Sequence, residues 1–543
     1  MHSPLSASQE FAARLLDLPA AASCLRDYQR RQLQQVAQSI RQQIYRLLVQ
    51  LPTGGGKTHE LAAITLCAQL AGLRVMILAT RTRLVRQIHE RLREFGIPHG
   101  VIAAEMRGML DRFQLVQVAS ADTLYRRCLG DGRMPLPSAE VVIFDEAHLA
   151  VARSRMALLE QYPQAVRIGF TATPARNSGA SLSAGFDQLI TGPTILELIR
   201  GGQLVQPRIF NVPIVTKQEL KELPKDKAND YAPEALAALL SRQKLIGDVV
   251  ANWLRLAAGK RTIVFACSKS HGAQLTQEFC TAGIAAELLT DQDDEAEREA
   301  VIGRLVSGQT LVVVNCFLMA YGIDIPSVEA IVLARPTRSV TMFLQMVGRG
   351  LRPAEGKSDC LIIDHGRVVQ NLGLPHADRT WTLDGKRNVN REAESKQSAR
   401  SRTEKARTCP ECSHMWLVSE DGSACHNCGW KPAPSARAVE VEAAELAELE
   451  ENDPATVATD SLVVQEFFRQ ALHYGIARNA EKWRLTPNKV RAAAWYRTKD
   501  KFKLQHAFLP GWVWFIDAMP CTPQVSGWMK SQQIRYAKRR SAA

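Results

Sequence analysis

Short runs of aliphatic and β-branched residues alternate with helix-like segments from about residue 25 to about residue 370. The runs are "RVMILAT", "QLVQVAS", "EVVIFDEAH", "VRIGFTAT", "RTIVFAC", "QTLVVVN" and "EAIVLAR". Such an alternation is typical of parallel sheets whose strands are joined by crossover helices. Because the runs are numerous enough for two sheets, we expect an α/β fold with two parallel-sheet domains in tandem.

The pattern changes at two places, and these changes predict the domain boundaries. Near residues 200–245, "GGQLVQP" and the polar "KELPKDKAND" interrupt the alternation, and after about residue 370 the strand-like runs stop. We therefore expect one sheet domain at 1–205 and a second at 206–370. The remainder divides by composition into a basic linker (371–408), a cysteine-rich segment (409–430), an acidic linker (431–460) and a basic, tryptophan-rich region (461–543).

Composition narrows the class of protein only moderately. The 543 residues carry a formal net charge of +13, an excess that is compatible with a polyanionic partner without requiring one. No apolar run approaches the ~20 residues that cross a bilayer, and the first 25 residues lack a signal-peptide layout. Eight of the twelve cysteines are scattered, mostly in apolar segments, and four cluster at 409–428. We expect a cytoplasmic protein with one metal site and no membrane partner.

The stretch "LVQLPTGGGKTHELAAITL" (48–66) has the layout of a phosphate-binding loop between a strand and a helix. Gly54, Gly55 and Gly56 would let the backbone close around phosphate oxygens. Lys57 would neutralise the β- and γ-phosphates, and the Thr58 hydroxyl would ligate Mg²⁺. The strict Walker pattern begins with glycine, where this chain has Leu51. The stretch predicts a site for ATP and Mg²⁺; the alternative is a glycine-rich turn.

A second candidate motif, "VVIFDEAH" (141–148), follows about ninety residues later. Asp145 would hold Mg²⁺, and Glu146 would orient and deprotonate the attacking water. A strand that ends in two surface acids is common by itself, but its occurrence after a phosphate-binding loop favours a catalytic role. His148 would contact "TAT" (171–173) or the later arginine motif, unless it has only a structural role in its loop.

Taken in order, the motifs between residues 25 and 365 resemble those of superfamily 2 helicases and translocases of the DEAD/DEAH type. The resemblance implies two RecA-like domains. It implies that Gln29 in "LRDYQ" contacts adenine, and that "ATRTRLVRQ" (79–87) and "ASADTLYR" (119–126) bind nucleic-acid phosphates. It also implies that "TAT" couples the ATP and nucleic-acid sites. The second domain would contribute "VFACSKSHG" (264–272) and "YGIDIP" (321–326), with Gly322 and Asp324 near the ribose and the nucleic-acid backbone. It would also contribute "QMVGRGLR" (345–352), with Gln345, Arg349 and Arg352.

The two domains would divide the catalytic residues between them. Lys57, Asp145 and Glu146 lie in the first, whereas Arg349 and Arg352 lie in the second. Because phosphoryl transfer depends on positioning and charge stabilisation, hydrolysis would require the domains to close. Either arginine could instead be a groove or surface residue. Within the superfamily, residues 335–366 most resemble RadD-type bacterial DNA repair ATPases and related prophage helicases.

The clustered cysteines have the spacing of a zinc ribbon. Cys409 and Cys412 form one C-x-x-C pair, and Cys425 and Cys428 form another after twelve residues. Four thiolates favour structural Zn²⁺, because they leave no open position for a catalytic water. His414 and His426 are alternative ligands. The ribbon could contact nucleic acid, another protein or only its own chain.

The C-terminal region combines positive charge with aromatic rings. Residues 478–543 contain fourteen Lys or Arg and three acidic residues, and among them lie Trp483, Trp495, Tyr496, Trp512, Trp514 and Trp528. Cationic side chains beside aromatic rings that can stack on bases are typical of sites that bind single-stranded or branched DNA. The alternative is that the rings form a small core and the charges solvate it.

These features predict an ATP-dependent DNA helicase or translocase that acts in repair, recombination or prophage replication. DNA is the expected partner, single-stranded or branched, and a single-strand-binding or recombination protein is a further candidate. The alternatives are the motor subunit of a restriction or defence system, an RNA helicase, and a clamp that does not hydrolyse ATP. The intact set of Lys57, Asp145, Glu146 and Arg349 argues against the clamp.

Overall fold

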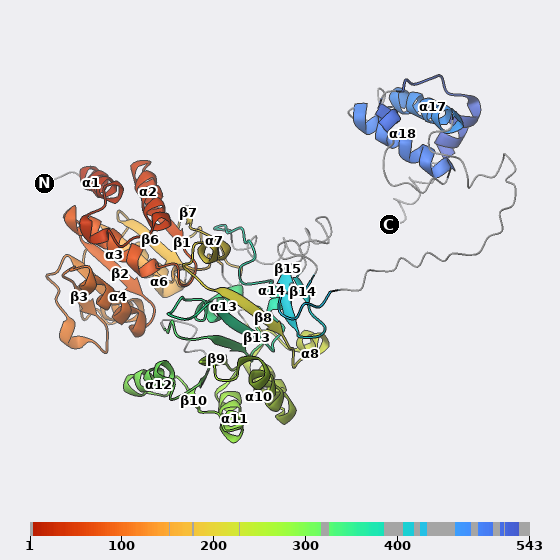
Figure 1. The fold of residues 1–543 in the computed structure, drawn as a ribbon. Helices are drawn as coiled ribbons and strands as arrows, with labels where there is room; N and C mark the ends of the chain where they lie inside the picture. The colour runs from red at the N-terminus through yellow and green to blue at the C-terminus, as the bar shows by residue number, and fades with distance from the viewer. Residues whose placement is uncertain are drawn as a thin grey trace. The chain divides into compact units, whose positions relative to one another are not determined.

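The computed structural model describes residues 4–150, 152–175, 179–226, 229–316, 325–384, 406–417, 424–431, 462–478, 487–502, 511–514 and 516–531. The chain forms two compact units, Met1–Ser435 and Ala436–Ala543. The first unit contains two lobes, each built around a sheet (Figure 1). We call the part with β1–β7 the first lobe and the part with β8–β15 the second lobe.

The first lobe has a seven-stranded sheet in the order β3-β4-β2-β5-β6-β1-β7, and every strand pairing in it is parallel. The strands are β1 (Arg46–Gln50), β2 (Val75–Ala79), β3 (Gly100–Ile102), β4 (Val116–Ser120), β5 (Val141–Asp145), β6 (Val166–Thr171) and β7 (Gln188–Thr191). The predicted parallel sheet is therefore confirmed, and "RVMILAT", "QLVQVAS", "EVVIFDEAH" and "VRIGFTAT" supply four of its strands.

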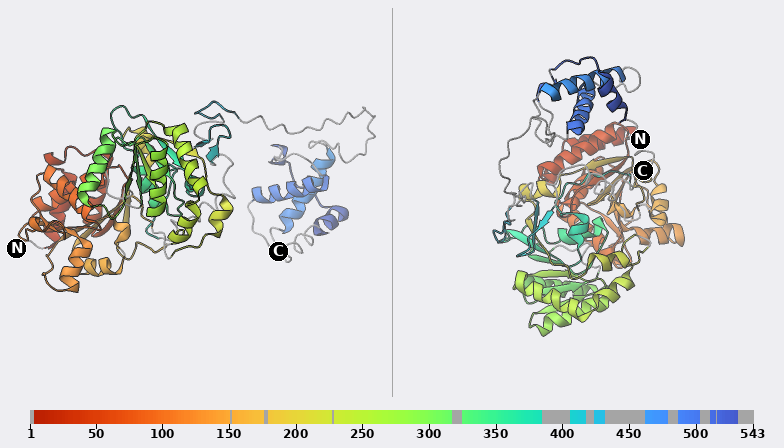
Figure 2. Two further views of the ribbon diagram at one scale, coloured as in Figure 1. Left: turned by 90° about the horizontal axis from the view of Figure 1, so that it is seen from below. Right: turned by 90° about the vertical axis from the view of Figure 1, so that its right-hand side faces the viewer.

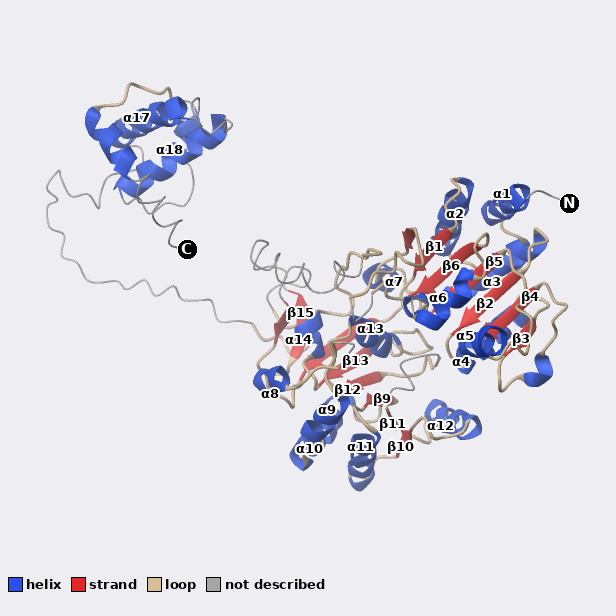
Figure 3. Cartoon of the chain, turned by 180° about the vertical axis from the view of Figure 1, so that it is seen from behind, coloured by secondary structure: helices blue, strands red, loops and turns tan. Residues whose placement is uncertain are grey.

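Helices cover both faces of the first sheet, as the views in Figure 2 and Figure 3 show. Successive strand residues point to opposite faces, so Leu47 and Val49 enter one core while Leu48 enters the other. The first core is completed by α1 (Pro4–Leu16), α2 (Asp27–Arg41), α3 (Lys57–Leu70) and α4 (Thr82–Glu94). The second core is completed by α5 (Ala121–Tyr125) and α6 (Arg153–Glu160). All strands that carry candidate site residues are thus buried on both faces.

The second lobe has an eight-stranded sheet in the order β10-β11-β9-β12-β13-β8-β15-β14. The first six strands pair in parallel: β8 (Gln206–Asn211), β9 (Thr262–Phe265), β10 (Ala286–Leu289), β11 (Val312–Asn315), β12 (Ala330–Leu333) and β13 (Asp359–Asp364). One face carries α10 (Gln243–Ala257) and α11 (Lys269–Thr281). The other carries α7 (Ile195–Arg200), α12 (Glu295–Ser307), α13 (Val340–Gly348) and α14 (Val368–Leu372).

The cysteine-rich segment continues the second sheet. Its strand β15 (His414–Leu417) pairs antiparallel with β8, placing His414 opposite Phe210, and β14 (Ala406–Thr408) pairs with β15. The backbone N–H of Asn211 also donates to the carbonyl of Ser413 at 2.9 Å. The ribbon is therefore part of the sheet of the second lobe and not a detached module.

The first part of the segment expected to be a basic linker packs against both lobes. Leu374 and Pro375 are buried, because they are apolar and follow directly from α14. Further on, the carbonyl of Leu383 accepts hydrogen bonds from the Leu182 N–H at 2.9 Å and the Ser181 hydroxyl at 2.8 Å. Residues 372–384, the first part of the predicted basic linker, therefore form a strap from the second lobe back to the first; residues 385–405 lie outside the described part.

The second unit is a small helical domain. Its helices α17 (Leu462–Arg478) and α18 (Pro487–Phe502) pack with a short 3₁₀ turn, η6 (Gly511–Trp514), around an apolar core. Trp495 is 1% exposed in that core, whereas Trp514 is 39% and Tyr496 is 55% exposed. Trp483 and the acidic linker lie outside the described residues. Both predicted roles for aromatic rings, core and surface, therefore have representatives in this domain.

Within the described residues, no helix has both the length and the apolar character that a bilayer crossing requires.

Candidate functional site between the two lobes

The loop between β1 and α3 has a conformation that only glycine adopts easily. Gly54 and Gly56 have φ angles of +85° and +88°. A Cβ atom on Gly54 would lie 2.7 Å from the Leu204 side chain, and one on Gly56 would lie 2.7 Å from Nε2 of Gln29. The loop leads into the N-terminus of α3, where the helix dipole favours an anion.

The start of α2 supports this loop. Gln29 donates from Nε2 to the Gly56 carbonyl at 3.0 Å, and its Oε1 accepts from the Arg26 N–H at 2.9 Å. The Tyr28 hydroxyl donates to the Gly55 carbonyl at 2.8 Å. Gln29 was predicted to contact adenine, but in this structure both ends of its amide bind the protein backbone. The second acceptor site of Oε1 could still bind a base, so the contact with adenine stays a prediction.

The two acids of "VVIFDEAH" lie at the end of β5, beside the loop. Asp145 accepts at Oδ1 from the Glu146 N–H at 2.9 Å, and Glu146 has a left-handed backbone with φ of +53°. Burial and the neighbouring Glu146 raise the pKa of Asp145. Burial also opposes ionisation of Glu146, but its hydrogen bond to His148 and the nearby Lys57, His148 and Arg349 outweigh burial and lower its pKa. Of these two carboxyl groups, Glu146 is therefore the one that ionises at the lower pH.

His148 links the second motif to the end of β6. Its Nδ1 lies 3.1 Å from the Thr171 hydroxyl and 3.3 Å from Oε2 of Glu146, and its side chain is 5% exposed. The Thr171 hydroxyl donates to the Thr173 carbonyl at 3.1 Å. Of the two partners left open by the sequence, "TAT" is the one that His148 contacts.

Helix α13 of the second lobe lies against these groups. Gln345 is fully buried, and its Nε2 lies 3.4 Å from Oε2 of Glu146. Arg349 is 7% exposed and close enough to influence the pKa of both Glu146 and Lys57. A Cβ on Gly348 would lie 2.6 Å from Thr53, so α13 touches the phosphate-binding loop directly. The structure thus brings the candidate residues of the two lobes together.

The charges at this place suit a bound polyanion. Burial lowers the pKa of Lys57; Glu146 and Asp145 oppose this shift, and Arg349 and Arg352 reinforce it. Burial also lowers the pKa of Arg352 to about 10. Three cations therefore converge on two carboxylates in an enclosed space beside a glycine cradle. These residues fit the triphosphate of ATP, and Thr58 in the first turn of α3 and Asp145 offer oxygen ligands that fit Mg²⁺.

The four cysteine sulfurs form a compact cluster. The Sγ atoms of Cys409, Cys412, Cys425 and Cys428 all lie within 4.8 Å of one another, and two pairs are 3.6 Å apart. Tetrahedral Zn²⁺ with Zn–S bonds of about 2.3 Å requires sulfurs about 3.8 Å apart, so this donor set fits zinc. His414 and His426 are not part of the cluster of described ligands. Asn427 beside it accepts from Arg208 of β8 at 2.6 Å, which ties the ribbon to the second lobe.

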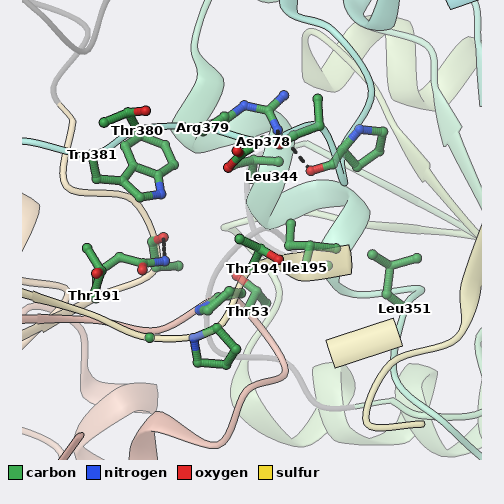
Figure 4. Close-up of a pocket in the computed structure, with 18 residues that line it drawn as sticks. Thr53, Thr191, Thr194, Ile195, Leu344, Leu351, Asp378, Arg379, Thr380 and Trp381 are labelled. Atoms are coloured by element: carbon green, nitrogen blue, oxygen red, sulfur yellow. Dashed lines mark hydrogen bonds between the residues drawn. The ribbon is translucent and has the colours of Figure 1, made fainter. Parts of the chain in front are cut away.

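A cavity of about 320 Å³ lies beside the phosphate-binding loop, with walls from both lobes (Figure 4). The loop contributes Thr53, helix α13 contributes Leu344, and the strap contributes Arg379 and Trp381. Arg379 donates to the carbonyls of Leu372, Leu374, Pro375 and Ala377. This arginine therefore holds the strap in shape.

Two family models match the chain in the order of its lobes. Residues 23–176 match the model described as "Type III restriction enzyme, res subunit", and residues 244–354 match "Helicase conserved C-terminal domain". The chain belongs to the superfamily 2 helicases. Its enzyme class is that of nucleic-acid-dependent ATPases, which use ATP as the nucleotide and bind nucleic acid.

Relatives of this helicase occur in phages and yeast. It is 29% identical over 382 residues to the 51.5 kDa protein of a Lactococcus phage, covering 70% of this chain and 77% of that one. It is 31% identical over 363 residues to IRC3 of Saccharomyces cerevisiae, covering 63% of this chain and 52% of that one. The chain thus spans about three quarters of the phage protein and about half of the yeast protein. The expected closeness to RadD-type ATPases stays a prediction.

Among solved structures, the helicase is similar to a fragment described as the HsdR subunit of a type I restriction enzyme from Vibrio vulnificus. The TM-score is 0.53 at 21% identity, over 70% of this chain and 69% of that one. This likeness shows the fold alone: two parallel sheets in tandem, as the sequence predicted.

Two predicted site residues are not described, and one buried acid near the site was not predicted. Gly322 and Asp324, expected near the ribose and the nucleic-acid backbone, lie outside the described residues. Conversely, no pattern pointed to Glu60, one turn after Lys57 in α3. Its side chain is fully buried, and among the described residues neither carboxylate oxygen has a hydrogen-bond partner. Burial raises its pKa well above the usual range. The feature of the sequence that could have indicated Glu60 is its spacing from Lys57. Residues three apart in a helix are neighbours, so Glu60 lies on the inner face of α3 together with Lys57.

Proposed function

We propose that this helicase couples ATP hydrolysis to movement on DNA, and that it acts in repair, recombination or prophage replication. The observation that carries the proposal is the meeting of Glu146 from the first lobe with Gln345 and Arg349 from the second. Catalytic groups that come from two lobes make hydrolysis depend on how the lobes are placed. A dependence of this kind can be converted into movement along a strand.

In this proposal the first lobe binds the nucleotide and the second lobe completes the site. The glycine cradle and Lys57 bind the phosphates, while Thr58 and Asp145 hold Mg²⁺. Bound ATP supplies the phosphoanhydride whose hydrolysis provides the free energy. Glu146, kept ionised by its cationic neighbours, orients the attacking water and accepts its proton.

The second-lobe residues act through charge and position. Arg349 and Arg352 stabilise the negative charge that develops on the transferred phosphoryl group. Gln345 holds the Glu146 carboxylate, and His148 connects that carboxylate to Thr171. "TAT" begins with the last residue of β6 in the first lobe, and α13 belongs to the second lobe. A change in the position of the Glu146 carboxylate would therefore alter contacts in both lobes.

We further propose that the helical unit at the C-terminus binds single-stranded or branched DNA. Exposed Lys489, Tyr496 and Trp514 offer charge and stacking surface. Arg491 has a structural role instead, since it donates to the carbonyls of Val513 and Ile516. We propose that the zinc of the ribbon is structural and stabilises β15, and through β15 the sheet of the second lobe.

The test is to measure ATP turnover with single-stranded, duplex and forked DNA and with RNA, side by side. The proposal expects at least tenfold stimulation by single-stranded or forked DNA and weaker stimulation by RNA. If RNA stimulates ATP turnover and none of the DNA substrates does, the nucleic acid substrate is RNA. No stimulation by any of the four would contradict a translocating motor.

The motor subunit of a restriction or defence system is a second candidate, favoured by the match of residues 23–176 to a restriction-enzyme subunit model. A motor that moves on duplex DNA displaces a third strand bound in the major groove, whereas a helicase separates a fork. Triplex displacement without fork unwinding would favour the second candidate, and fork unwinding would favour the first.

A further inference from the structure

Helix α4 of the first lobe begins with a concentration of positive charge. Arg81 precedes the helix, Arg83 and Arg86 follow within its first turns, and the first turn contains no acidic residue. Arginines at this end add to the positive end of the helix dipole instead of compensating it. The N-terminus of α4 is therefore a place that favours an anion.

In this structure the anion is supplied by the other lobe. Nη1 of Arg86 lies 3.4 Å from Oε1 of Glu295 and 3.6 Å from Oε1 of Glu299, both on α12. Burial lowers the pKa of the neighbouring Arg83; the same two carboxylates oppose this shift, and Arg298 and Arg86 reinforce it. Glu295 and Glu299 are one turn apart and share a face of α12.

The acid between them has a different partner. Glu297 accepts from Arg304 of its own helix at 2.9 Å, and its backbone N–H donates to Oδ1 of Asp294, the residue that caps the helix, at 2.8 Å. It therefore belongs to the internal structure of α12. Glu297 has the same charge and lies in the same first turn as Glu295, which makes it a matched control.

We propose that Glu295 and Glu299 occupy a phosphate-binding surface on α4, and that the sugar-phosphate backbone of a nucleic acid strand replaces them when it binds. This inference rests on the proposed function and adds how the motor senses its substrate. While the carboxylates are in place, they tie α12 to α4 and exclude the strand. When phosphates take their place, the two lobes are released at this contact.

The strength of the ion pairs suits such an exchange. Both distances exceed the 2.7–2.9 Å typical of charge-assisted hydrogen bonds. The Arg86 and Glu295 side chains are about one third exposed, and Glu299 is 65% exposed. Exposed pairs of this kind shift an equilibrium by about fivefold at most, so a strand that offers several phosphates can displace them.

The test compares Glu295→Gln with Glu297→Gln, in the wild-type and Arg86→Gln backgrounds of the full chain. Affinity for a fluorescein-labelled single-stranded DNA 20-mer is measured by anisotropy without nucleotide. Glu295→Gln should bind about two- to fivefold more tightly than wild type, whereas Glu297→Gln should differ by less than twofold. In the Arg86→Gln background the gain from Glu295→Gln should disappear.

Equal gains in the two single variants would reveal a general charge effect and overturn this inference alone. A gain that persists in the Arg86→Gln background would overturn it as well. If the wild-type protein neither binds the 20-mer nor responds to it in ATP turnover, the proposed function falls and this inference falls with it.

Discussion

Nε2 of Gln345 in the second lobe lies 3.4 Å from Oε2 of Glu146 in the first, and both side chains are buried. The contact joins residues that are 199 positions apart in sequence and lie in different sheets. It places the carboxylate that should activate water under the control of the lobe that carries Arg349.

The roles of Lys57 and Glu146 can be separated by mutation. Lys57→Ala should abolish ATP turnover, because it removes the cation at the centre of the glycine cradle. Glu146→Gln should keep ATP binding and lose turnover, because the amide cannot accept a proton. Fluorescent-nucleotide binding and steady-state turnover measure the two effects. Normal turnover of Glu146→Gln would exclude this residue as the base.

Metal content should follow the cysteine cluster. Purified protein should carry one zinc per chain, and Cys425→Ser should lose it, whereas Cys24→Ser should retain it because the exposed Cys24 lies outside the cluster. Since β15 pairs with β8, loss of zinc should also lower the melting temperature of the ATPase unit. Elemental analysis and thermal unfolding check both points. A fully reduced, folded preparation without zinc would refute the ribbon.

Burial of Glu60 should cost stability at neutral and alkaline pH. Its folded pKa is raised above the unfolded value, so wild-type stability should fall as the pH rises above about 4.5 towards the folded pKa. Glu60→Leu removes this cost and should stabilise the fold by about 1–3 kcal/mol at pH 8, with a smaller gain near pH 5. Thermal unfolding at both pH values measures the difference. The exposed Glu90→Leu is the control and should show little change at either pH.

A result in the opposite direction would also be informative. If Glu60→Leu were less stable at both pH values, the carboxylate would have a stabilising partner such as Lys57. In that case its pKa would not be raised in the folded protein.

Removal of the second unit should separate binding from hydrolysis. A chain that ends at Ser435 keeps the strap and the ribbon, both of which pack on the ATPase unit. It should hydrolyse ATP at saturating DNA but bind single strands more weakly and with less salt dependence. Each lost phosphate contact removes about 0.7 from the log–log slope, so five lost contacts change it by roughly 3.5. An unchanged slope would mean that the helical unit contacts a protein partner or braces the motor.

The sequence predicted both parallel sheets because strands buried on both faces are almost continuously apolar. It predicted the nucleotide loop because Gly54 and Gly56 have backbone angles that other residues rarely adopt. The positions of these motifs on β1 and β5 followed from the same patterns. That Lys57, Glu146 and Arg349 lie together was expected from the resemblance to helicases, and the structure brings them together; their roles stay predictions.

Other features could not be predicted, because they depend on contacts between distant segments. The pairing of β15 with β8 joins residues about 200 positions apart, and no local sequence pattern predicts it. The contact of Leu383 with the first lobe and the ion pairs of Arg86 also join residues that are distant in sequence. Trp495 and Trp514 look alike in the sequence, and only the packing of α17 against α18 decides which one enters the core.

The most direct test of the central claim is ATP turnover by Arg349→Ala at saturating single-stranded DNA. If hydrolysis requires a positive charge supplied across the lobe interface, turnover should fall by about 10³-fold or more, while ATP affinity stays within about twofold of wild type. A fall of only two- or threefold would contradict this role for Arg349 and transfer it to Arg352.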